Sequence, residues 1–419
     1  FLQRARHCFT ICGGEVMAAP KLRFKEFDGD WSSIAIGNLL KIKSGLGFKA
    51  EEYTTEEAIR LLQIENVGYG AVKWTHNVKY VPHDYLSIHS ELVLKEDDIV
   101  LALNRPVTND QLKIAKLTKD DGPSILYQRV GKLEFTKNEI DHNFIFQIFQ
   151  KEVKSYVLNS SIGSDQPFIS TTDLYKHKIT LPAQKEQTKI ASFLSAVDEK
   201  ISQLTQKHAL LSQYKQGMMQ KLFSQQIRFK ADDGSEFEEW EEKQLGEIIK
   251  FVNGKGHEND VDSDGSYTLI NSKFLSTNGS VAKKVNKCNQ KVMNDSLVMV
   301  MSDVPNGKAL AKVMYILDGS NFALNQRIGM FIFHKDHYPK FFQYQLNRHQ
   351  YYLAFDSGVG QTNLKKEDVL NCPILVPCIE EQTKIANFLS SIDQKIEVVA
   401  QQIEQAKQWK KGLLQQMFV

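Results

Sequence analysis

Hydrophobic side chains recur at alternating steps of three and four residues along two long stretches of the chain. In the first stretch this seam consists of Ile190, Leu194, Val197, Ile201, Leu204 and Leu211. In the second stretch the same register gives Ile385, Leu389, Ile392, Ile396, Val399 and Ile403. A heptad spacing predicts a long helix with one apolar seam. We expect the two seams to pack on each other; the alternative is two unrelated amphipathic helices, each buried in its own core.

The two stretches are copies of one another. The first contains Glu186-Gln-Thr-Lys-Ile-Ala-Ser-Phe-Leu and the second Glu381-Gln-Thr-Lys-Ile-Ala-Asn-Phe-Leu, at an offset of 381 − 186 = 195. A proline upstream and a Glu-Gln pair in the first turn indicate a helix start. A helix from Glu186 to Phe223 would be roughly 55 Å long at about 1.5 Å per residue. Lys215 and Lys410 interrupt the seams, and we expect the helix contact to loosen there.

The repeat is larger than the helix. Arg23-Phe-Lys followed by Trp31 is matched by Arg228-Phe-Lys followed by Trp240. The segments 94–103 and 292–301 both have the form of a turn that leads into a buried strand. Gln128-Arg-Val-Gly likewise matches Gln326-Arg-Ile-Gly. A large internal repeat of this kind predicts the order globular region, helix, globular region, helix.

The predicted fold class is α+β. We expect two similar globular α/β domains separated by two long repeated helices, which pack as an antiparallel coiled coil with pseudo-two-fold symmetry. Met17-Ala-Ala-Pro has the form of an ordinary start, so the residues before it are left out of the predicted fold. The predicted divisions are an N-terminal tail at 1–20, a first globular domain at 21–182, a central helix at 183–226, a second globular domain at 227–377 and a C-terminal helix at 378–419.

Composition narrows the possible functions only a little. The formal net charge is +2, so a site for a polyanion must be a local patch rather than a global basic field. The 5 cysteines form no paired framework, which favours a reducing, cytoplasmic location. No run is long and apolar enough to span a membrane, so we expect no membrane association.

The motifs of the common enzymes are missing. The sequence contains no Gly-x-x-x-x-Gly-Lys-[Ser/Thr] phosphate loop and no Asn-Pro-Pro-[Phe/Tyr] run of an adenine methyltransferase. Gly45-Leu-Gly47 and Gly254-Lys-Gly256 lack a third glycine and are interpreted as ordinary turns. No paired His/Cys spacing indicates a metal site. We therefore expect a chain with no catalytic residues, metal or cofactor of its own.

The repeated residues resemble the specificity subunits of type I restriction–modification systems. The resemblance is carried by the twin segments that begin at Glu186 and Glu381 and by Gly358-Val-Gly-Gln-Thr-Asn before the second helix. It extends from about Lys21 to Val419. The first half carries Gly163-Ser-Asp-Gln-Pro-Phe-Ile instead of the Gly-x-x-Gln-x-Asn form, a departure that affects the local loop contact rather than the fold.

This resemblance implies a function and a set of partners. Each globular domain would be a target-recognition domain for one half of a bipartite, gapped site in double-stranded DNA. The helices would set the spacer and dock two methyltransferase subunits, with restriction subunits joining the full complex. S-adenosylmethionine, ATP and Mg²⁺ would then belong to the partner subunits, whose adenine-methyltransferase and ATP-dependent endonuclease activities this chain would direct.

Candidate DNA contacts fall into shared and divergent positions. Residues identical in both halves cannot distinguish two sequences, so they suit phosphate contact or framework packing; they are Gln128, Gln326, Arg129, Arg327, Gln166 and Gln361. In the divergent loops, Arg105 suits guanine, and the candidates for adenine edges are Asn66, Asn104, Asn109, Asn271 and Asn306. The candidates for phosphate contact are Lys41, Lys43, Lys49, Lys255, Lys273 and Lys308.

Two other hypotheses stay open at this point. The chain could carry nuclease or methyltransferase chemistry itself, although the missing motifs count against this. It could also be a coiled-coil scaffold or adaptor that binds proteins rather than DNA. Salt-sensitive, sequence-dependent DNA binding would separate the first hypothesis from the scaffold.

Overall fold

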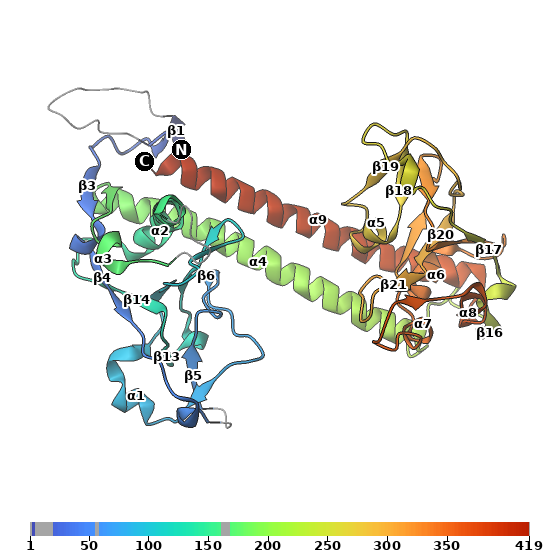
Figure 1. Ribbon diagram of the computed structural model, residues 1–419, viewed down its shortest axis with the longest axis horizontal. Helices are drawn as coiled ribbons and strands as arrows, with labels where there is room; N and C mark the ends of the chain where they lie inside the picture. The colour runs from blue at the N-terminus through green and yellow to red at the C-terminus, as the bar shows by residue number, and fades with distance from the viewer. Residues whose placement is uncertain (1, 5–19, 55–57, 161–167, 419) are drawn as a thin grey trace. The chain divides into compact units, whose positions relative to one another are not determined.

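The computed structural model describes residues 2–4, 20–54, 58–160 and 168–418 (Figure 1). Gln166 lies outside these residues. Strand β1, Leu2–Arg4, pairs antiparallel with β2, Leu22–Phe24, so part of the predicted tail takes part in backbone pairing. In chain order, α1 to α9 are Tyr85–Ile88, His142–Ser160, Thr171–Leu174, Gln184–Phe223, Ser272–Ser276, Pro339–Leu346, Gln350–Leu353, Lys366–Leu370 and Ile379–Met417.

The chain divides into two compact units, and the division falls inside both long helices. The first unit comprises Phe1–Thr205 and Gln401–Val419, and the second comprises Gln206–Ala400. Each unit therefore holds one globular domain, the beginning of one long helix and the end of the other.

The first unit is built on two sheets. The larger has the strand order β4-β14-β9-β12-β6, formed by Leu40–Ser44, Val130–Phe135, Ile99–Ala102, Ile114–Lys116 and Tyr69–Ala71. The smaller has the order β7-β5-β13-β8, formed by Tyr80–Val81, Ile59–Leu62, Ser124–Leu126 and Val93–Leu94. All four residues of β9 are buried, which confirms the predicted strand after the turn at Asp97. Three short pairs complete the strands: β1 with β2, β3 (Ser32–Ala35) with β15 (Lys178–Leu181), and β10 (Val107–Thr108) with β11 (Gln111–Leu112).

The second unit repeats this plan with fewer strands. Its larger sheet has the order β17-β24-β20-β22, formed by Ile249–Asn253, Ile328–Phe333, Ser296–Val300 and Val313–Ile316. Its smaller sheet has the order β19-β18-β23, formed by Lys283–Val285, Tyr267–Ile270 and Phe322–Leu324. The remaining pairs are β16 (Glu241–Gln244) with β26 (Pro373–Val376) and β21 (Ser302–Asp303) with β25 (Thr362–Asn363). The buried β20 confirms the second predicted strand.

Helix α4 begins two residues before the predicted Glu186, α9 begins two residues before the equivalent Glu381, and each helix joins two cores. In the first unit, the start of α4 (Ile190, Leu194, Val197) shares one hydrophobic core with the end of α9 (Leu413, Met417). In the second unit the roles are exchanged: Ile385, Leu389 and Ile392 of α9 share a core with Leu222 of α4. Part of the predicted seam thus packs into the globular cores as well as against the other helix. Leu204, Val399 and Ile403 are also buried, whereas Ile201, Leu211 and Ile396 are half-buried.

In each unit the two helix segments run antiparallel (Figure 1). An ion pair marks the contact: Asp198 Oδ1 lies 2.7 Å from Lys410 Nζ in the first unit, and Asp393 Oδ1 lies 2.6 Å from Lys215 Nζ in the second. These pairs are equivalent, because both aspartates and both lysines are related by the repeat (393 − 198 = 195 and 410 − 215 = 195). The expectation that the helix contact loosens at the two lysines is therefore wrong.

The same aspartates also bind the domain. Gln147 Nε2 of α2 donates to Asp198 at 2.8 Å, and the Tyr344 hydroxyl of α6 donates to Asp393 at 2.7 Å. Burial raises the pKa of Tyr344, and the hydrogen bond to Asp393 contributes in the same direction, so the hydroxyl stays protonated. Each unit therefore has a three-way junction between its domain and both long helices.

A second repeated contact joins each domain's first segment to the start of its helix. Arg23 donates to both carboxylate oxygens of Glu186, each at 2.7 Å, and Arg228 donates to both oxygens of Glu381 at 3.2 and 2.8 Å. We call each of these the Arg–Glu clamp. The Trp240 indole N–H also donates to Glu381, at 2.9 Å.

The adjacent glutamines complete the helix starts. Gln187 donates to the Pro182 carbonyl at 2.9 Å and accepts from the Asp141 amide at 3.1 Å. Gln382 makes the equivalent contacts with the Pro377 carbonyl and the Tyr338 amide, both at 2.8 Å. The repeated Glu-Gln pair is thus explained by buried polar contacts that fix each helix to its own domain.

Candidate nucleic-acid interface

The repeated Gln-Arg dipeptide forms the same tight turn in both units. Arg129 and Arg327 both have left-handed backbones, with φ of 66° and 67°. Their carbonyls accept the amides of Leu103 and Met301, each at 2.8 Å. Both arginine side chains are exposed. A left-handed arginine is strained, and two matched cases indicate that the turn is held by its surroundings.

The Gly-x-Gly segments lie against these turns. A Cβ on Gly45 would lie 2.4 Å from the Tyr127 carbonyl oxygen, and one on Gly254 would lie 1.9 Å from that of Asn325. Only glycine permits this approach. The interpretation of both segments as ordinary turns is therefore wrong, since they are the backbone surfaces on which the Gln-Arg turns rest.

Two exposed loops of the second unit are hydrogen-bonded to each other. The first runs from Ser302 to Lys308 and the second from Asp356 to Gln361; we call them the paired loops. Strands β21 and β25 pair at their base. The Asn306 amide donates to Asp356 Oδ2 at 3.1 Å, and Gln361 Nε2 donates to the Ser302 hydroxyl at 2.6 Å.

Two aspartates hold the backbone of the paired loops. Asp303 Oδ2 accepts the amides of Ala309 at 2.7 Å and Leu310 at 3.1 Å. Asp356 Oδ1 accepts the Gly358 amide at 3.0 Å and the Thr362 hydroxyl at 3.1 Å. These internal contacts use both carboxylates as structural acceptors and leave Asn306 and Lys308 exposed nearby.

The corresponding loop of the first unit follows β9 and carries the predicted Asn104, Arg105 and Asn109. Arg105 and Asn109 are exposed with φ of 44° and 51°, and Asn104 is half-buried. Asn109 Nδ2 donates to the Tyr69 hydroxyl at 3.1 Å. Next to it, hydrogen bonds from Lys154 and Lys411 lower the pKa of Asp110. The loop is thus tied to α2 and to the end of α9.

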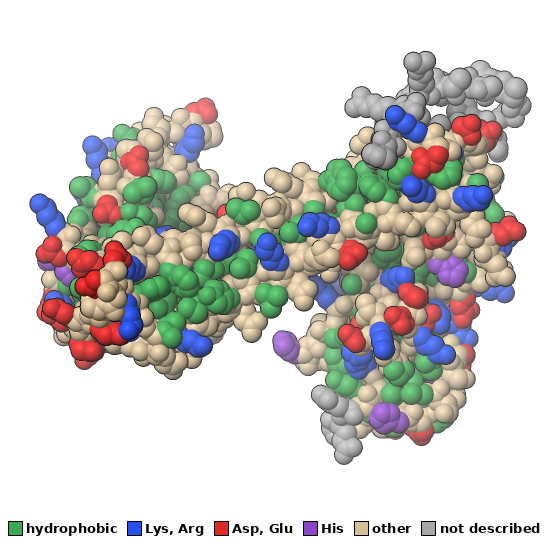
Figure 2. Space-filling view, turned by 180° about the vertical axis from the view of Figure 1, so that it is seen from behind, with side chains coloured by type: hydrophobic (Ala, Val, Ile, Leu, Met, Phe, Trp, Pro, Cys, Tyr) green, Lys and Arg blue, Asp and Glu red, His purple; other side chains and the backbone are tan. Residues whose placement is uncertain are grey.

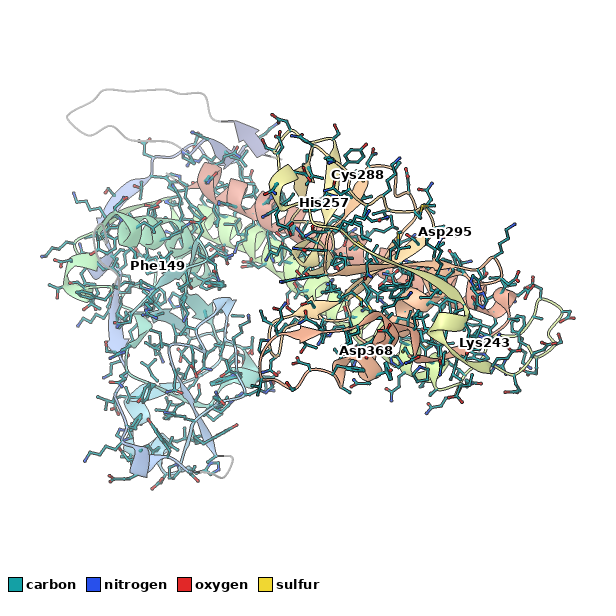
Figure 3. The ribbon with its side chains drawn as sticks, turned by 45° about the vertical axis from the view of Figure 1, so that its right-hand side comes forward. Phe149, Lys243, His257, Cys288, Asp295 and Asp368 are labelled. Carbon is teal, nitrogen blue, oxygen red and sulfur yellow. The ribbon has the colours of Figure 1, made fainter. Side chains whose placement is uncertain are left out.

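The predicted lysines lie at separate places on the two units. Lys43 is half-buried, whereas the other candidates are exposed: Lys41, Lys49, Lys255, Lys273 and Lys308. The loop that carries Lys255 is fixed by buried His257, which accepts the Asn289 amide at 2.9 Å. Figure 3 shows His257 and Cys288 close together on this side of the second unit. The candidate lysines therefore belong to different elements: Lys41 and Lys43 to β4, Lys255 to the loop after β17, Lys273 to α5 and Lys308 to the loop after β21.

Two of the asparagine candidates have structural roles. Asn66 is 1% exposed; its side-chain oxygen accepts the Gln63 amide and its side-chain nitrogen donates to the Lys73 carbonyl. Asn66 therefore cannot reach a base in this structure, and its assignment as an adenine reader is a mistake. Asn271 is the N-cap of α5 and accepts the Phe274 amide at 2.9 Å. Sequence alone could not separate these turn-forming roles from exposed ones.

The surface carries both charges. Figure 2 shows Lys and Arg side chains interspersed with Asp and Glu over the face that it presents, with hydrophobic side chains exposed between them. Among the described residues, no group of three or more His, Cys, Asp or Glu side chains is arranged to hold a metal ion. None of the helices in the described ranges is long and apolar enough to cross a membrane.

Two matched α/β domains on two long helices, with shared turns and divergent exposed loops, define a duplicated recognition protein. The family model for the type I restriction modification DNA specificity domain matches residues 28–213 and again 237–408. The chain therefore belongs to this family.

Individual relatives agree. The chain is 37% identical over 223 residues to the type I restriction enzyme MjaVIII specificity subunit of Methanocaldococcus jannaschii, an alignment that covers 53% of this chain and 52% of that protein. It is 31% identical over 176 residues to the EcoAI specificity subunit of Escherichia coli, which covers 42% of this chain and 29% of that protein. These alignments span about half or less of the relatives' lengths.

The fold has also been seen in a solved structure. A type I restriction–modification S subunit from M. genitalium superposes with a TM-score of 0.61 at 17% identity, covering 96% of this chain and 99% of that chain. The predicted fold class of two globular α/β domains and two long helices is thereby confirmed.

Proposed function

We propose that this chain is the DNA specificity subunit of a type I restriction–modification complex and that each globular domain reads one half of a gapped site. The observation that carries the proposal is the two-fold repetition of a matched framework with unlike loops. The Arg–Glu clamps and Gln-Arg turns match, whereas the loop from Asn104 to Asn109 differs from the paired loops. Loops on a rigid scaffold carry specificity, so unlike loops suit unlike half-sites.

The shared exposed residues suit the part of DNA that is the same everywhere. Among the described residues, the side chains of Arg129 and Arg327 make no hydrogen bond or ion pair, and both residues lie in turns of the same geometry. Phosphates are common to all sequences, so an arginine at the same place in each domain positions the duplex without reading it. The divergent Arg105, Asn109 and Asn306 remain candidates for base contact.

The long helices are proposed to set the distance between the half-sites. In each unit the domain is fixed to both helices by a clamp and by an aspartate junction. Inserting one heptad in each helix keeps the apolar seam in register and adds about 10 Å. The gap in the recognised site should then grow by about three base pairs, at about 3.4 Å per step. An unchanged gap would show that the helices do not determine it.

The proposed partners are two methyltransferase subunits and, in the full complex, restriction subunits. They would supply the adenine methylation and ATP-dependent cleavage, with S-adenosylmethionine, ATP and Mg²⁺ bound to them. Two like partners need two like surfaces. Tyr214 and Trp409 occupy equivalent positions on α4 and α9 (409 − 214 = 195), and both are about half exposed. These aromatic side chains are well suited to protein contact.

The decisive experiment is selection from a randomised duplex pool by this chain co-purified with its methyltransferase subunit. A gapped motif with two unlike halves, lost at high salt, is the expected result. Enrichment of no motif, or of one ungapped motif, would favour the protein-binding scaffold instead. Native mass spectrometry of the same sample should show two methyltransferase copies for each copy of this chain.

A further inference from the structure

The tips of the paired loops carry two exposed valines. Val304 is 63% exposed and Val359 is 86% exposed. Val359 lies between Gly358 and Gly360, whose left-handed backbones (φ 72° and 81°) turn the chain sharply on either side of it. A single exposed apolar residue is common on protein surfaces. Two at the tips of hydrogen-bonded neighbouring loops need a further explanation.

The loops hold these valines in fixed places. Asp303 accepts the Val304 amide at 2.9 Å, in addition to the amides that begin the next segment. The Ser357 hydroxyl donates to the Val359 carbonyl at 3.1 Å. The contact between Asn306 and Asp356 ties the two loops together. The loop backbone that carries the valines is therefore preorganised, so the loops lose little conformational entropy when they bind a partner.

The position of the loops indicates what they contact. The segment from Ser302 to Lys308 is one of the places where the two halves differ in kind. A protein partner that binds both halves in the same way should contact residues that are the same in both halves. The two DNA half-sites are expected to differ, so an unlike loop suits DNA better. Asn306, Lys308 and Gln361 are exposed on the same two loops as the valines, and they supply the amide and ammonium groups that suit base edges and phosphates.

We propose that Val304 and Val359 contact thymine methyl groups in the major groove of the half-site read by the second domain. The C5-methyl of thymine is the apolar group that base edges present in that groove, and small aliphatic side chains recognise it. The polar neighbours would then bind adjacent base edges or phosphates. This inference rests on the proposed function and specifies which base the second domain reads by apolar contact.

The test begins with the gapped motif selected by the wild-type complex. Duplexes that carry this motif are prepared with each thymine of the second half-site replaced in turn by deoxyuridine, which lacks only the methyl group. Affinities are measured for the wild type, Val304→Ser and Val359→Ser. The matched control is Leu317→Ser, because Leu317 is 72% exposed in the same unit but follows β22 rather than belonging to the paired loops.

The wild type should lose roughly fourfold in affinity at one or more thymines, as expected for one buried methyl group. The valine variant that lost the contact should bind the thymine and deoxyuridine duplexes equally. Selection with that variant should relax the second half-site at the same position and leave the first half-site unchanged. Leu317→Ser should behave as the wild type.

Three results would overturn the inference. One is wild-type binding that is indifferent to every deoxyuridine substitution, because no thymine methyl group would then be read. Another is a valine variant that weakens all sequences equally. The last is a variant whose complex no longer assembles, since the tips would then contact protein. Failure of the wild type to select any gapped motif would refute the proposed function itself, so the two failures are distinguishable.

Discussion

Glu381→Gln should loosen the second unit far more than its small change in shape suggests. The Glu381 side chain is fully buried and accepts two N–H groups of Arg228 and the indole N–H of Trp240. The side-chain amide of the glutamine keeps one acceptor oxygen but directs its NH2 donor toward the guanidinium of Arg228. Arg228, whose side chain is 15% exposed, then loses its buried counter-charge and keeps only the exposed Glu239 carboxylate, which lies 3.4 Å away.

The magnitude follows from this burial. Removing one member of a buried ion pair costs about 3–5 kcal/mol, and the partial exposure of Arg228 places the expected loss near the lower end, at about 3 kcal/mol. For a unit of this size that lowers Tm by roughly 6–12 °C. The double variant Arg228→Met/Glu381→Gln should be less destabilised than Glu381→Gln alone, because the guanidinium that lost its buried partner is removed as well.

Hydrogen–deuterium exchange measured by mass spectrometry is the suitable assay, because it reports each unit separately. Exchange should rise at β16, β26 and the first turn of α9, while peptides of the first unit serve as the internal reference. Glu186→Gln is the matched variant and should raise exchange in the first unit. Two results would contradict a local role of the clamp in holding each domain to its helix. One is an equal rise of exchange in both units for either substitution. The other is a loss of unfolding free energy below about 1 kcal/mol.

Three further predictions concern Lys308, the Asp198–Lys410 pair and His349. Lys308→Ala should weaken binding to all sequences alike and reduce the slope of log affinity against log salt by about 0.9, measured by titration at several salt concentrations; a sequence-selective loss would contradict phosphate contact. Asp198→Lys should destabilise the first unit by about 1 kcal/mol, and adding Lys410→Asp should recover part of it in a double-mutant cycle of thermal unfolding; no coupling would refute the helix junction. Burial lowers the pKa of His349, whose ring accepts the Tyr351 amide at the start of α7. Stability should therefore be full above the ordinary histidine pKa of about 6.5 and fall as the pH drops below it. His349→Asn keeps a capping acceptor and should remove this dependence in urea unfolding at pH 5.5 and 7.5.

The repeat made the long helices and the central strands predictable. A match at a fixed offset fixes which residues are equivalent, and the heptad seam then identifies the helices without any tertiary information. The strands after Asp97 and Asp295 could be predicted from the repeat as well, because each is a short apolar segment that directly follows a turn. What the repeat shows, however, is equivalence and not contact.

The contacts could not be predicted because they join residues far apart in the chain. Glu186 and Arg23 are 163 residues apart, and in the sequence they belong to separate matching segments. In the sequence, Lys215 and Lys410 only interrupt the apolar seam. Their role is not visible there, because the aspartate that pairs with each lysine lies on the other helix. Asn66 looked like a free loop residue because its two backbone partners close around it only in the folded domain.

Burial combined with the internal repeat sorts the shared and unshared residues into three physical classes. Residues that are identical and buried, such as Glu186 and Glu381, are explained by contacts inside each unit. Residues that are identical and exposed, such as Arg129 and Arg327, are unexplained by the fold and need a partner that both units meet in the same way. Residues that are exposed and unlike, such as Val359, suit a partner that differs between the units. A DNA duplex with two different half-sites meets both requirements at once, because its phosphates repeat and its bases do not.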